Sequence, residues 1–187
     1  WRHALHMQAD ISVVVDPGHL RQYICKMILS THAIVGGAIA YLLPSHPILV
    51  AVSGVASHFA IDAIPHWDYP LYAISLGNDA DNRRLKIDRR LCTDLLTIAI
   101  DALAGLSAAI VLFSSGAPIW TIMLGAIAGM LPDALQFVQS LYRGEPLATL
   151  QRFHGWIHSK RRLDWQIGIS SQALFAALIA TAAMIVK

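Results

Sequence analysis

Charged residues are scarce in this chain. Asp, Glu, Lys and Arg make up 14% of its 187 residues, whereas soluble domains carry roughly 25%. Their near balance gives a formal net charge of +2, which offers no support for a nucleic-acid-binding surface. Only two cysteines are present, too few for a disulfide scaffold. Hydrophobic residues make up 56% of the chain, so intrinsic disorder is excluded as well.

The few charges are absent from three long stretches of the sequence. No Asp, Glu, Lys or Arg occurs in 27–61, 102–132 or 165–186. A membrane-spanning helix needs about 20 mostly apolar residues, and each stretch reaches that length. A helix of a soluble domain would instead carry charges at helical spacing on its wet face. The pattern therefore favours an integral membrane protein over the alternative, an unusually apolar soluble helical domain.

Prolines and a small-residue turn divide these stretches into five expected helices. Pro44 and Pro47 interrupt the first stretch, which predicts a tight helical hairpin, and Pro65 ends its second arm. A turn at 114–118 follows the third helix, and Pro132 can bend the fourth. The expected ranges are 29–43, 47–64, 89–113, 118–140 and 165–186. The predicted fold class is an all-α, polytopic membrane helical bundle with about five transmembrane helices.

Lysine and arginine fall on one side of this five-helix topology. Basic residues cluster in 65–90 and 141–164 and also precede the first helix, whereas the turns 44–47 and 114–117 contain none. By the positive-inside rule, the N-terminus and both long loops lie in the cytoplasm. We therefore expect a multi-pass protein of the inner (plasma) membrane, with membrane lipid as its immediate partner and no nucleic-acid partner.

The first 26 residues differ in character from the rest. Their composition is mixed, and Met27 opens an apolar sequence suited to begin the first helix. They carry no apolar segment of the kind that precedes a signal-peptide cleavage site. We divide the chain into an N-terminal extension, 1–26, which is either not native or a genuine interfacial segment, and a single membrane-embedded helical domain, 27–187.

Histidines and aspartates gather at the cytoplasmic side of the predicted topology. His58 and Asp62 are one helical turn apart and so share a face, and His154 and His158 have the same spacing in the second cytoplasmic loop. Ionisable residues at membrane depth are costly and are candidates for a functional site. Imidazole and carboxylate groups are common protein ligands of zinc. The expected metal ligands are His32, His58, Asp62, His66, Asp133, His154 and His158.

Other polar residues near this layer have competing explanations. Asp94 is either a first-turn helix charge or part of the site. Asp101, deeper on the same helix, is expected to support a histidine rather than to bind metal. Asp68 has aromatic neighbours in the sequence, so an interfacial position is expected for it. His46 falls at the opposite surface and is excluded from the site.

Four short motifs in these regions resemble a known family. Residues 153–159 are similar to the His-Arg-Gly-x-Thr-His-Ser box of the predicted membrane-bound metal-dependent hydrolases of bacteria and archaea, although the Arg after the first His is missing here. Residues 125–133 resemble the Gly-x-x-x-Pro-Asp box of that family. Thr31-His32 is similar to its opening segment, and 58–62 is similar to its His-x-x-x-Asp box.

The resemblance implies an all-α membrane hydrolase with distant similarity to the helical zinc phospholipase C and nuclease group. In that group, His and Asp or Glu ligands from several helices hold zinc ions. On this basis we expect a divalent transition metal as cofactor, with zinc as the first choice and one or two ions bound.

The leading hypothesis is metal-dependent hydrolysis at the cytoplasmic membrane surface. A spare carboxylate, Asp62 or Asp94, would act as general base. Arg152 or Lys160 would neutralise an anionic oxygen of a phosphoester or lipid-like substrate. One alternative is a small membrane transporter or ion-binding protein, in which Asp94 and Asp101 line a path. Another is a non-catalytic membrane protein whose metal only joins helices.

Single cysteines at two positions can test the orientation. Ser115→Cys should react with a membrane-impermeant thiol reagent in intact cells, because the 114–117 turn faces outward in this topology. Asn82→Cys should be protected, because its basic loop is cytoplasmic. Labelling is compared with the parent chain, in which Cys25 and Cys92 set the background. The reverse pattern would invert the topology.

Overall fold

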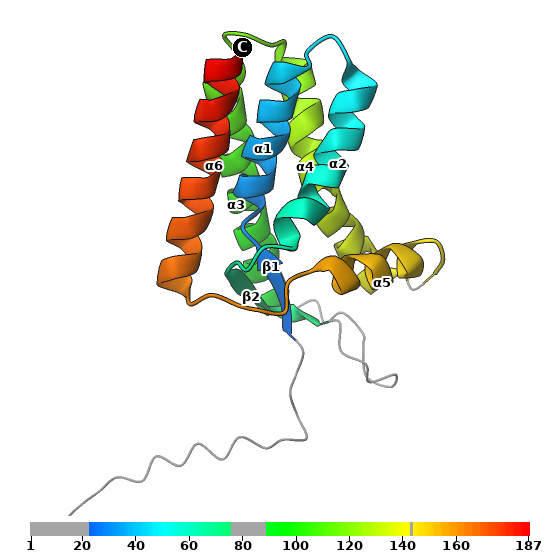
Figure 1. Cartoon of the computed structure of the whole chain (residues 1–187). Coiled ribbons are helices and arrows are strands. Elements are labelled where there is room, and N and C mark those ends of the chain that lie inside the picture. Colours follow the sequence, from blue (N-terminus) through cyan, green and yellow to red (C-terminus); the bar gives the residue numbers. More distant parts are fainter. Residues whose placement is uncertain (1–22, 76–88, 143) are drawn as a thin grey trace, which may run out of the picture.

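The computed structural model describes residues 23–75, 89–142 and 144–187. Within them, six helices and a two-stranded antiparallel sheet follow one another along the chain (Figure 1). The elements are β1 (Tyr23–Met27), α1 (Leu29–Leu42), α2 (Pro47–Asp62), β2 (Asp68–Ser75), α3 (Arg89–Phe113), α4 (Ile119–Leu141), α5 (Leu147–Ile157) and α6 (Trp165–Val186). The expected helical class is confirmed, and the small sheet is an addition to it.

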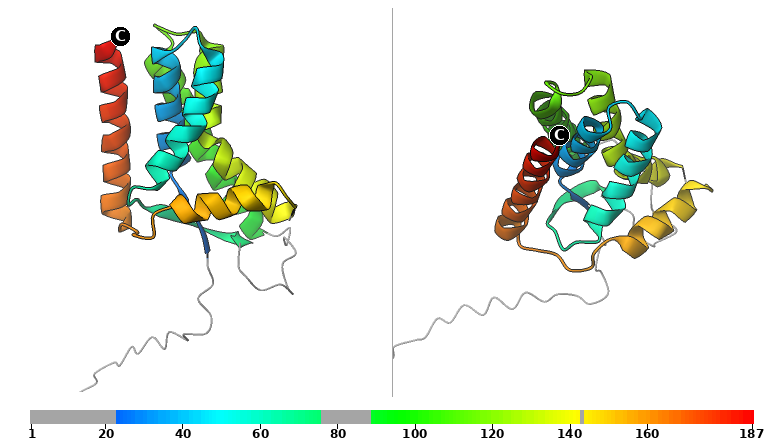
Figure 2. Two further views of the ribbon diagram at one scale, coloured as in Figure 1. Left: turned by 45° about the vertical axis from the view of Figure 1, so that its right-hand side comes forward. Right: turned by 45° about the horizontal axis from the view of Figure 1, so that its top comes forward.

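Five helices stand upright and one lies across their lower end. Helices α1, α2, α3, α4 and α6 run side by side, while α5 crosses the base of the bundle beside the sheet (Figures 1 and 2). The α1–α2 turn, the α3–α4 turn and the C-terminus all lie at the upper end. The upright helices therefore alternate in direction, as the distribution of prolines and turns in the sequence predicts.

The helix ends follow the local signals that the sequence carries. Pro47 occupies the first turn of α2, where its missing N–H costs no hydrogen bond, and Pro132 lies inside α4. The α3 and α6 ranges are those expected, and the other ends differ by one or two residues. Strand β1 covers Tyr23–Met27, so four residues on the N-terminal side of the expected domain boundary at 27 belong to an element of the described fold. The rest of the proposed extension, 1–22, lies outside the described residues.

By length and composition, three helices of the described chain could cross a membrane, fewer than the five expected. They are α3, the Ile119–Gln139 part of α4, and α6. Helices α1 and α2 are apolar but shorter. At 1.5 Å per residue, the 14 residues of α1 reach about 21 Å, less than the roughly 30 Å of a bilayer core. The chain below α1 forms strand β1 instead of extending the helix.

The outward faces of the bundle are apolar. Large side chains with more than half of their surface exposed occur on α2, α3 and α6, among them Ile48, Val52, Leu96, Leu103, Val111, Leu174 and Ile185. Soluble monomers rarely expose contiguous apolar patches of more than a few hundred Å². These faces are compatible with a membrane protein.

Helix α1 is the centre of the bundle and packs against α2, α3, α4 and α6. Gly36 of α1 and Gly125 of α4 meet backbone to backbone, so that a methyl group on either one would overlap the carbonyl group of the other. At Gly129, one turn further along α4, a methyl group would likewise overlap the carbonyl oxygen of His32. This approach brings the backbone of α4 against the two helices that carry His32 and His58.

Asp101 has a different role from the one expected. Its carboxylate accepts hydrogen bonds from the backbone N–H groups of Leu29 (2.5 Å) and Ser30 (3.2 Å) at the start of α1. The first N–H groups of a helix lack partners within the helix, and the positive end of the helix dipole favours an anion there. Asp101 therefore caps α1 from the neighbouring helix α3, and the expectation that it supports a histidine is corrected.

The backbone contact between α1 and α4 predicts a large effect for a single methyl group. Gly36→Ala should destabilise the protein by about 1–3 kcal/mol, because the neighbouring backbone has no free rotamer by which to yield. The midpoint of thermal unfolding, Tm, should fall by several degrees.

Gly155→Ala in α5 is the matched control. No atom of the described chain lies within 4 Å of a Cβ at this position, and Ala is favoured over Gly inside a helix by about 0.5–1 kcal/mol. Its Tm should be unchanged or slightly higher. Equal Tm values for the two variants would contradict the close packing of α1 on α4.

Candidate metal centre

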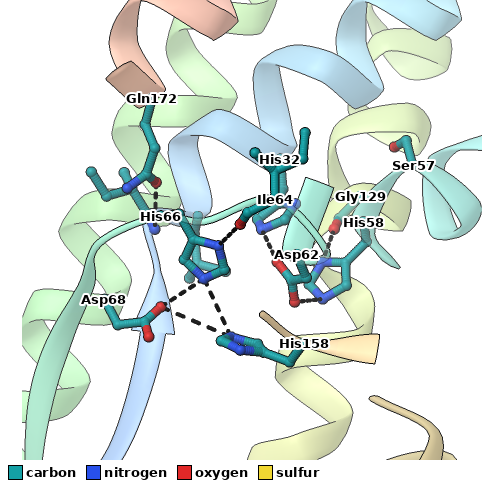
Figure 3. Close-up of polar contacts among 12 residues, drawn as sticks. His32, Ser57, His58, Asp62, Ile64, His66, Asp68, Gly129, His158 and Gln172 are labelled. Atoms are coloured by element: carbon teal, nitrogen blue, oxygen red, sulfur yellow. Dashed lines mark hydrogen bonds and ion pairs between the residues drawn. The ribbon is translucent and has the colours of Figure 1, made fainter. Parts of the chain in front are cut away.

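Histidine and aspartate side chains from distant parts of the sequence converge at the lower end of the bundle (Figure 3). Among the described residues there are three sets in which the potential ligand atoms of the set lie within 4.8 Å of one another: His32/His58/Asp133, His58/Asp62/His154 and His66/Asp68/His158. The first two sets share His58 and form one site, the inner group. The third set is the outer group.

The centre of the inner group is the carboxylate of Asp62. One oxygen lies 3.2 Å from Nε2 of His32, and the other lies 3.2 Å from Nε2 of His58 and 2.7 Å from Nε2 of His154. The three imidazoles come from α1, α2 and α5. All five members of the group are buried, with at most 4% of their surface exposed.

The orientation of the His58 ring shows which nitrogen faces the site. Its Nδ1 lies 2.8 Å from the carbonyl oxygen of Gly129, which can only accept, so Nδ1–H is the donor. In the neutral ring, Nε2 then carries a lone pair. This atom faces Nε2 of His154 at 3.4 Å and the Asp62 carboxylate. The lone pair of His58 Nε2 therefore faces a carboxylate oxygen of Asp62 at 3.2 Å, an arrangement that a proton or a cation relieves. His154 Nε2 lies within hydrogen-bond distance of the same oxygen, at 2.7 Å.

The outer group repeats this arrangement. His66 donates Nδ1–H to the carbonyl oxygen of Ile64 (2.7 Å), and His158 donates Nδ1–H to that of Ser159 (3.1 Å). Their Nε2 atoms face each other at 3.3 Å. Asp68 Oδ1 lies 2.9 Å from the first of these nitrogens and 3.9 Å from the second (Figure 3). Burial lowers the pKa of His66, but the Asp68 carboxylate outweighs it and raises the pKa above its usual value.

The spacing of the ligand atoms in both groups suits a small transition-metal ion. Bonds of 2.0–2.1 Å in a tetrahedral zinc site separate neighbouring ligand atoms by about 3.3 Å. Within His58, Asp62 and His154 the separations are 2.7–3.4 Å. Within His66, Asp68 and His158 they are 2.9–3.9 Å. Each group could therefore hold a metal ion.

Helix α5 places one histidine in each group. The expectation of a loop at His154 is corrected, because α5 includes this residue and buries its side chain to 2% exposure. His158 follows at the C-terminal end of the helix. The backbone then returns along the end of α2, where Ser159 N–H donates to the carbonyl oxygen of Asp62 (2.8 Å) and Leu163 N–H to that of His66 (3.0 Å). These bonds fix the position of both histidines.

All seven expected metal ligands lie in the two groups. Asp68, expected at the membrane interface, is instead buried in the outer group with 7% of its surface exposed. The sequence did carry a signal that Asp68 joins His66 in one group: the two are two residues apart, and in extended chain such residues point to the same side. His46 lies at the upper end of α2, away from both groups (Figure 1).

The other expected site residues lie apart from these ligands. Asp94 is buried on α3, but it belongs to none of the three ligand sets found in the described part of the chain. Arg152 is exposed and bound to Glu145 (3.0 Å) and to Thr149. Lys160 is exposed. A different basic side chain lies beside the outer group, that of Arg162, whose Nε lies 3.8 Å from Asp68 Oδ2.

Comparisons of the chain with models of protein families, with curated proteins and with solved structures find no match. The geometry of the two groups is therefore the basis for any functional conclusion.

Replacement of a ligand in the inner group should remove bound metal. We expect the metal content of purified His58→Ala to fall by about one equivalent relative to wild type, measured by inductively coupled plasma mass spectrometry. His46→Ala removes an exposed histidine from the same helix region and should keep the full metal content. Equal content in both variants would refute the assignment of His58 as a ligand.

Proposed function

We propose that the protein is a metal-dependent hydrolase of the inner membrane that acts at the cytoplasmic face on a phosphoester or lipid-like substrate. The carrying observation is that, in each group, two imidazole Nε2 atoms 3.3–3.4 Å apart converge on one buried carboxylate. Such groups are ordinary in metal centres and unfavourable without a cation or a shared proton.

Zinc is the proposed ion, because imidazole and carboxylate ligands with tetrahedral spacing suit it. A bound zinc ion would polarise a phosphoryl oxygen and lower the pKa of a coordinated water toward about 7. His58 and His66 hold their Nε2 atoms toward the metal position through Nδ1–H bonds to backbone carbonyls. This second bond fixes the tautomer and the ring orientation.

Asp62 is better placed to bind metal than to act as a general base. Its two oxygens already face three imidazole nitrogens, and its side chain is almost fully buried. A general base has to reach the proton that it removes. Asp94 belongs to none of the three ligand sets formed by the described residues, so it is not proposed as a ligand, and its role as a general base stays a prediction.

The proposed membrane position rests on the faces of the bundle. We propose that the five upright helices all lie in the bilayer, with α3, α4 and α6 crossing it and the shorter α1 and α2 completing the bundle. Aromatic side chains that favour the headgroup layer are exposed on α5 (Phe153 and Trp156) and at the start of α6 (Trp165). Helix α5 would then lie in the membrane interface, with its histidines turned inward.

The resemblance to membrane-bound metal-dependent hydrolases supports the same proposal. Its motifs are separated by many residues in the sequence, yet His32, the His58–Asp62 turn, Asp133 and His154 contribute to a single group. Convergence of this kind is expected where separate motifs build one site, and it is not required by the hydrophobic pattern that defines the helices.

A metal that only joins helices is the second candidate, and the inner group favours it. That group is enclosed and ties four helices together. The transporter alternative has less support, because Asp101, the residue that would begin a path through the bundle, caps the first turn of α1.

The proposal predicts bound metal and metal-dependent hydrolysis. Full-length protein, purified without chelators, should contain a stoichiometric transition metal. Removal of the metal should abolish hydrolysis of a phosphoester in detergent–phospholipid micelles, and added zinc should restore it. Wild type and His46→Ala should behave alike.

The same measurements separate the two candidates. A purely structural metal predicts that chelation lowers Tm while the metal-loaded protein hydrolyses none of a panel of phosphomonoesters and phosphodiesters. Protein that folds normally but contains no stoichiometric metal would refute both.

A further inference from the structure

The two groups differ in their access to solvent. The side chains of His32, His58, Asp62 and His154 are at most 3% exposed. In the outer group, His66 and Asp68 are buried, but 23% of the His158 side chain is exposed. Next to it, the side chain of Arg162 is 61% exposed. The outer group thus has an open side and the inner group does not.

The two groups also differ in the number of available ligands. The inner group holds five potential ligand side chains from α1, α2, α4 and α5, arranged as two overlapping sets of three that share His58. Among the described residues, the outer group offers three. Structural zinc sites are closed by four protein ligands, whereas catalytic sites have three and leave a position open to water or substrate.

We propose that the inner group binds a structural metal ion and that the outer group of His66, Asp68 and His158 is the catalytic centre, with Arg162 binding an anionic phosphoryl oxygen of the substrate. This inference rests on the proposed function and assigns it to one of the two groups. The substrate class is a phosphoester whose phosphate is reached from the open side of His158.

The position of Arg162 supports its role. Its backbone is held beside His66, since the two residues form a bridge and Leu163 N–H donates to the His66 carbonyl oxygen. Its Nε forms an ion pair with Asp68 Oδ2 at 3.8 Å, and its side chain is 61% exposed, so the guanidinium lies at the rim of the group. A guanidinium presents a planar fork of donors that matches phosphate oxygens. Arg152, the arginine expected from the sequence, is bound instead to Glu145.

Matched carboxylate variants test the division between the groups. Wild type should bind two metal equivalents, and Asp68→Asn and Asp62→Asn should each bind one. Asp68→Asn should change Tm by less than about 4 °C, whereas Asp62→Asn should lower it far more, since its metal joins four helices. Retention of both metals in Asp68→Asn would overturn the assignment of the outer group.

Replacement of the bound metals by Co²⁺ tests which group has an open coordination position, and it uses wild type and the Asp68→Asn variant, whose folding is checked by its Tm. Inorganic phosphate should change the visible absorption of one of the two Co²⁺ ions in wild type, because only the outer ion has a position open to a new ligand. In Asp68→Asn the phosphate-sensitive band should be missing. A phosphate response that persists in Asp68→Asn would place the open position elsewhere and overturn the proposal.

Neighbouring arginines provide a matched pair for the anion-binding role. Arg162→Ala should weaken phosphate binding to the Co²⁺ protein by about 10-fold or more, the usual loss for a hydrogen bond to a charged group. Arg161→Ala, which removes an adjacent exposed arginine, should stay within about 2-fold. An equal loss of phosphate affinity in both variants would mean that Arg162 acts only through the general positive charge of the surface, and it would overturn the proposed role of Arg162.

Hydrolysis assays show whether the phosphate belongs to a lipid headgroup or to a soluble ester. They also separate failure of the hydrolase proposal from failure of the division between the two groups. Asp68→Asn should lose at least about 100-fold in activity, since even changes to the partners of metal ligands cost 10–100-fold. Faster hydrolysis of phosphatidic acid in micelles than of p-nitrophenyl phosphate would indicate that the substrate is a lipid headgroup. The opposite preference would indicate a soluble ester. If metals and phosphate bind as described but neither compound is hydrolysed, the proposed function fails while the division into closed and open sites stands.

Discussion

The buried carboxylate of Asp62 constrains the lower half of the bundle more than any other group. A carboxylate without compensating partners is costly to bury. Here its oxygens face imidazoles from α1, α2 and α5 at 2.7–3.2 Å. The ring of His58 is fixed in turn by the carbonyl oxygen of Gly129 on α4. Four helices are thus tied to one charge, and their positions at this end follow from the need to compensate it.

The small residues of α1 and α4 make this convergence possible. Helices with bulky side chains at their contact stay 8–10 Å apart, but the contact of Gly36 with Gly125 lets these two backbones approach more closely. Gly129 lies next to the carbonyl of His32, so the same helix row that permits close packing also presents an acceptor to His58. In an apolar surrounding, where hydrophobic burial does not drive helix association, close packing and polar contacts of this kind hold a bundle together.

Helix α5 and the segment after it connect the two groups of ligands. Its inner face gives His154 to the inner group and its end gives His158 to the outer group, while Phe153 and Trp156 are exposed. The returning chain pairs with the end of α2 through the carbonyls of Asp62 and His66. An amphipathic helix at the base of the bundle is therefore in contact with both candidate metal positions, and its exposed aromatic face is of the kind suited to a membrane interface.

The sequence by itself determined the helices and the layer that holds the ligands. Charge-free stretches, Pro44, Pro47 and a small-residue turn are local signals, so they predicted the helix ranges and placed the seven candidate ligands at one end of the bundle. Only the tertiary structure divided those ligands into two groups, brought Asp68 into one of them and assigned Asp101 to the cap of α1. These contacts join residues far apart in the chain and depend on how each helix is rotated and how closely glycines let the backbones approach. Hydrophobic periodicity does not encode that rotation when a helix such as α1 is apolar on every side.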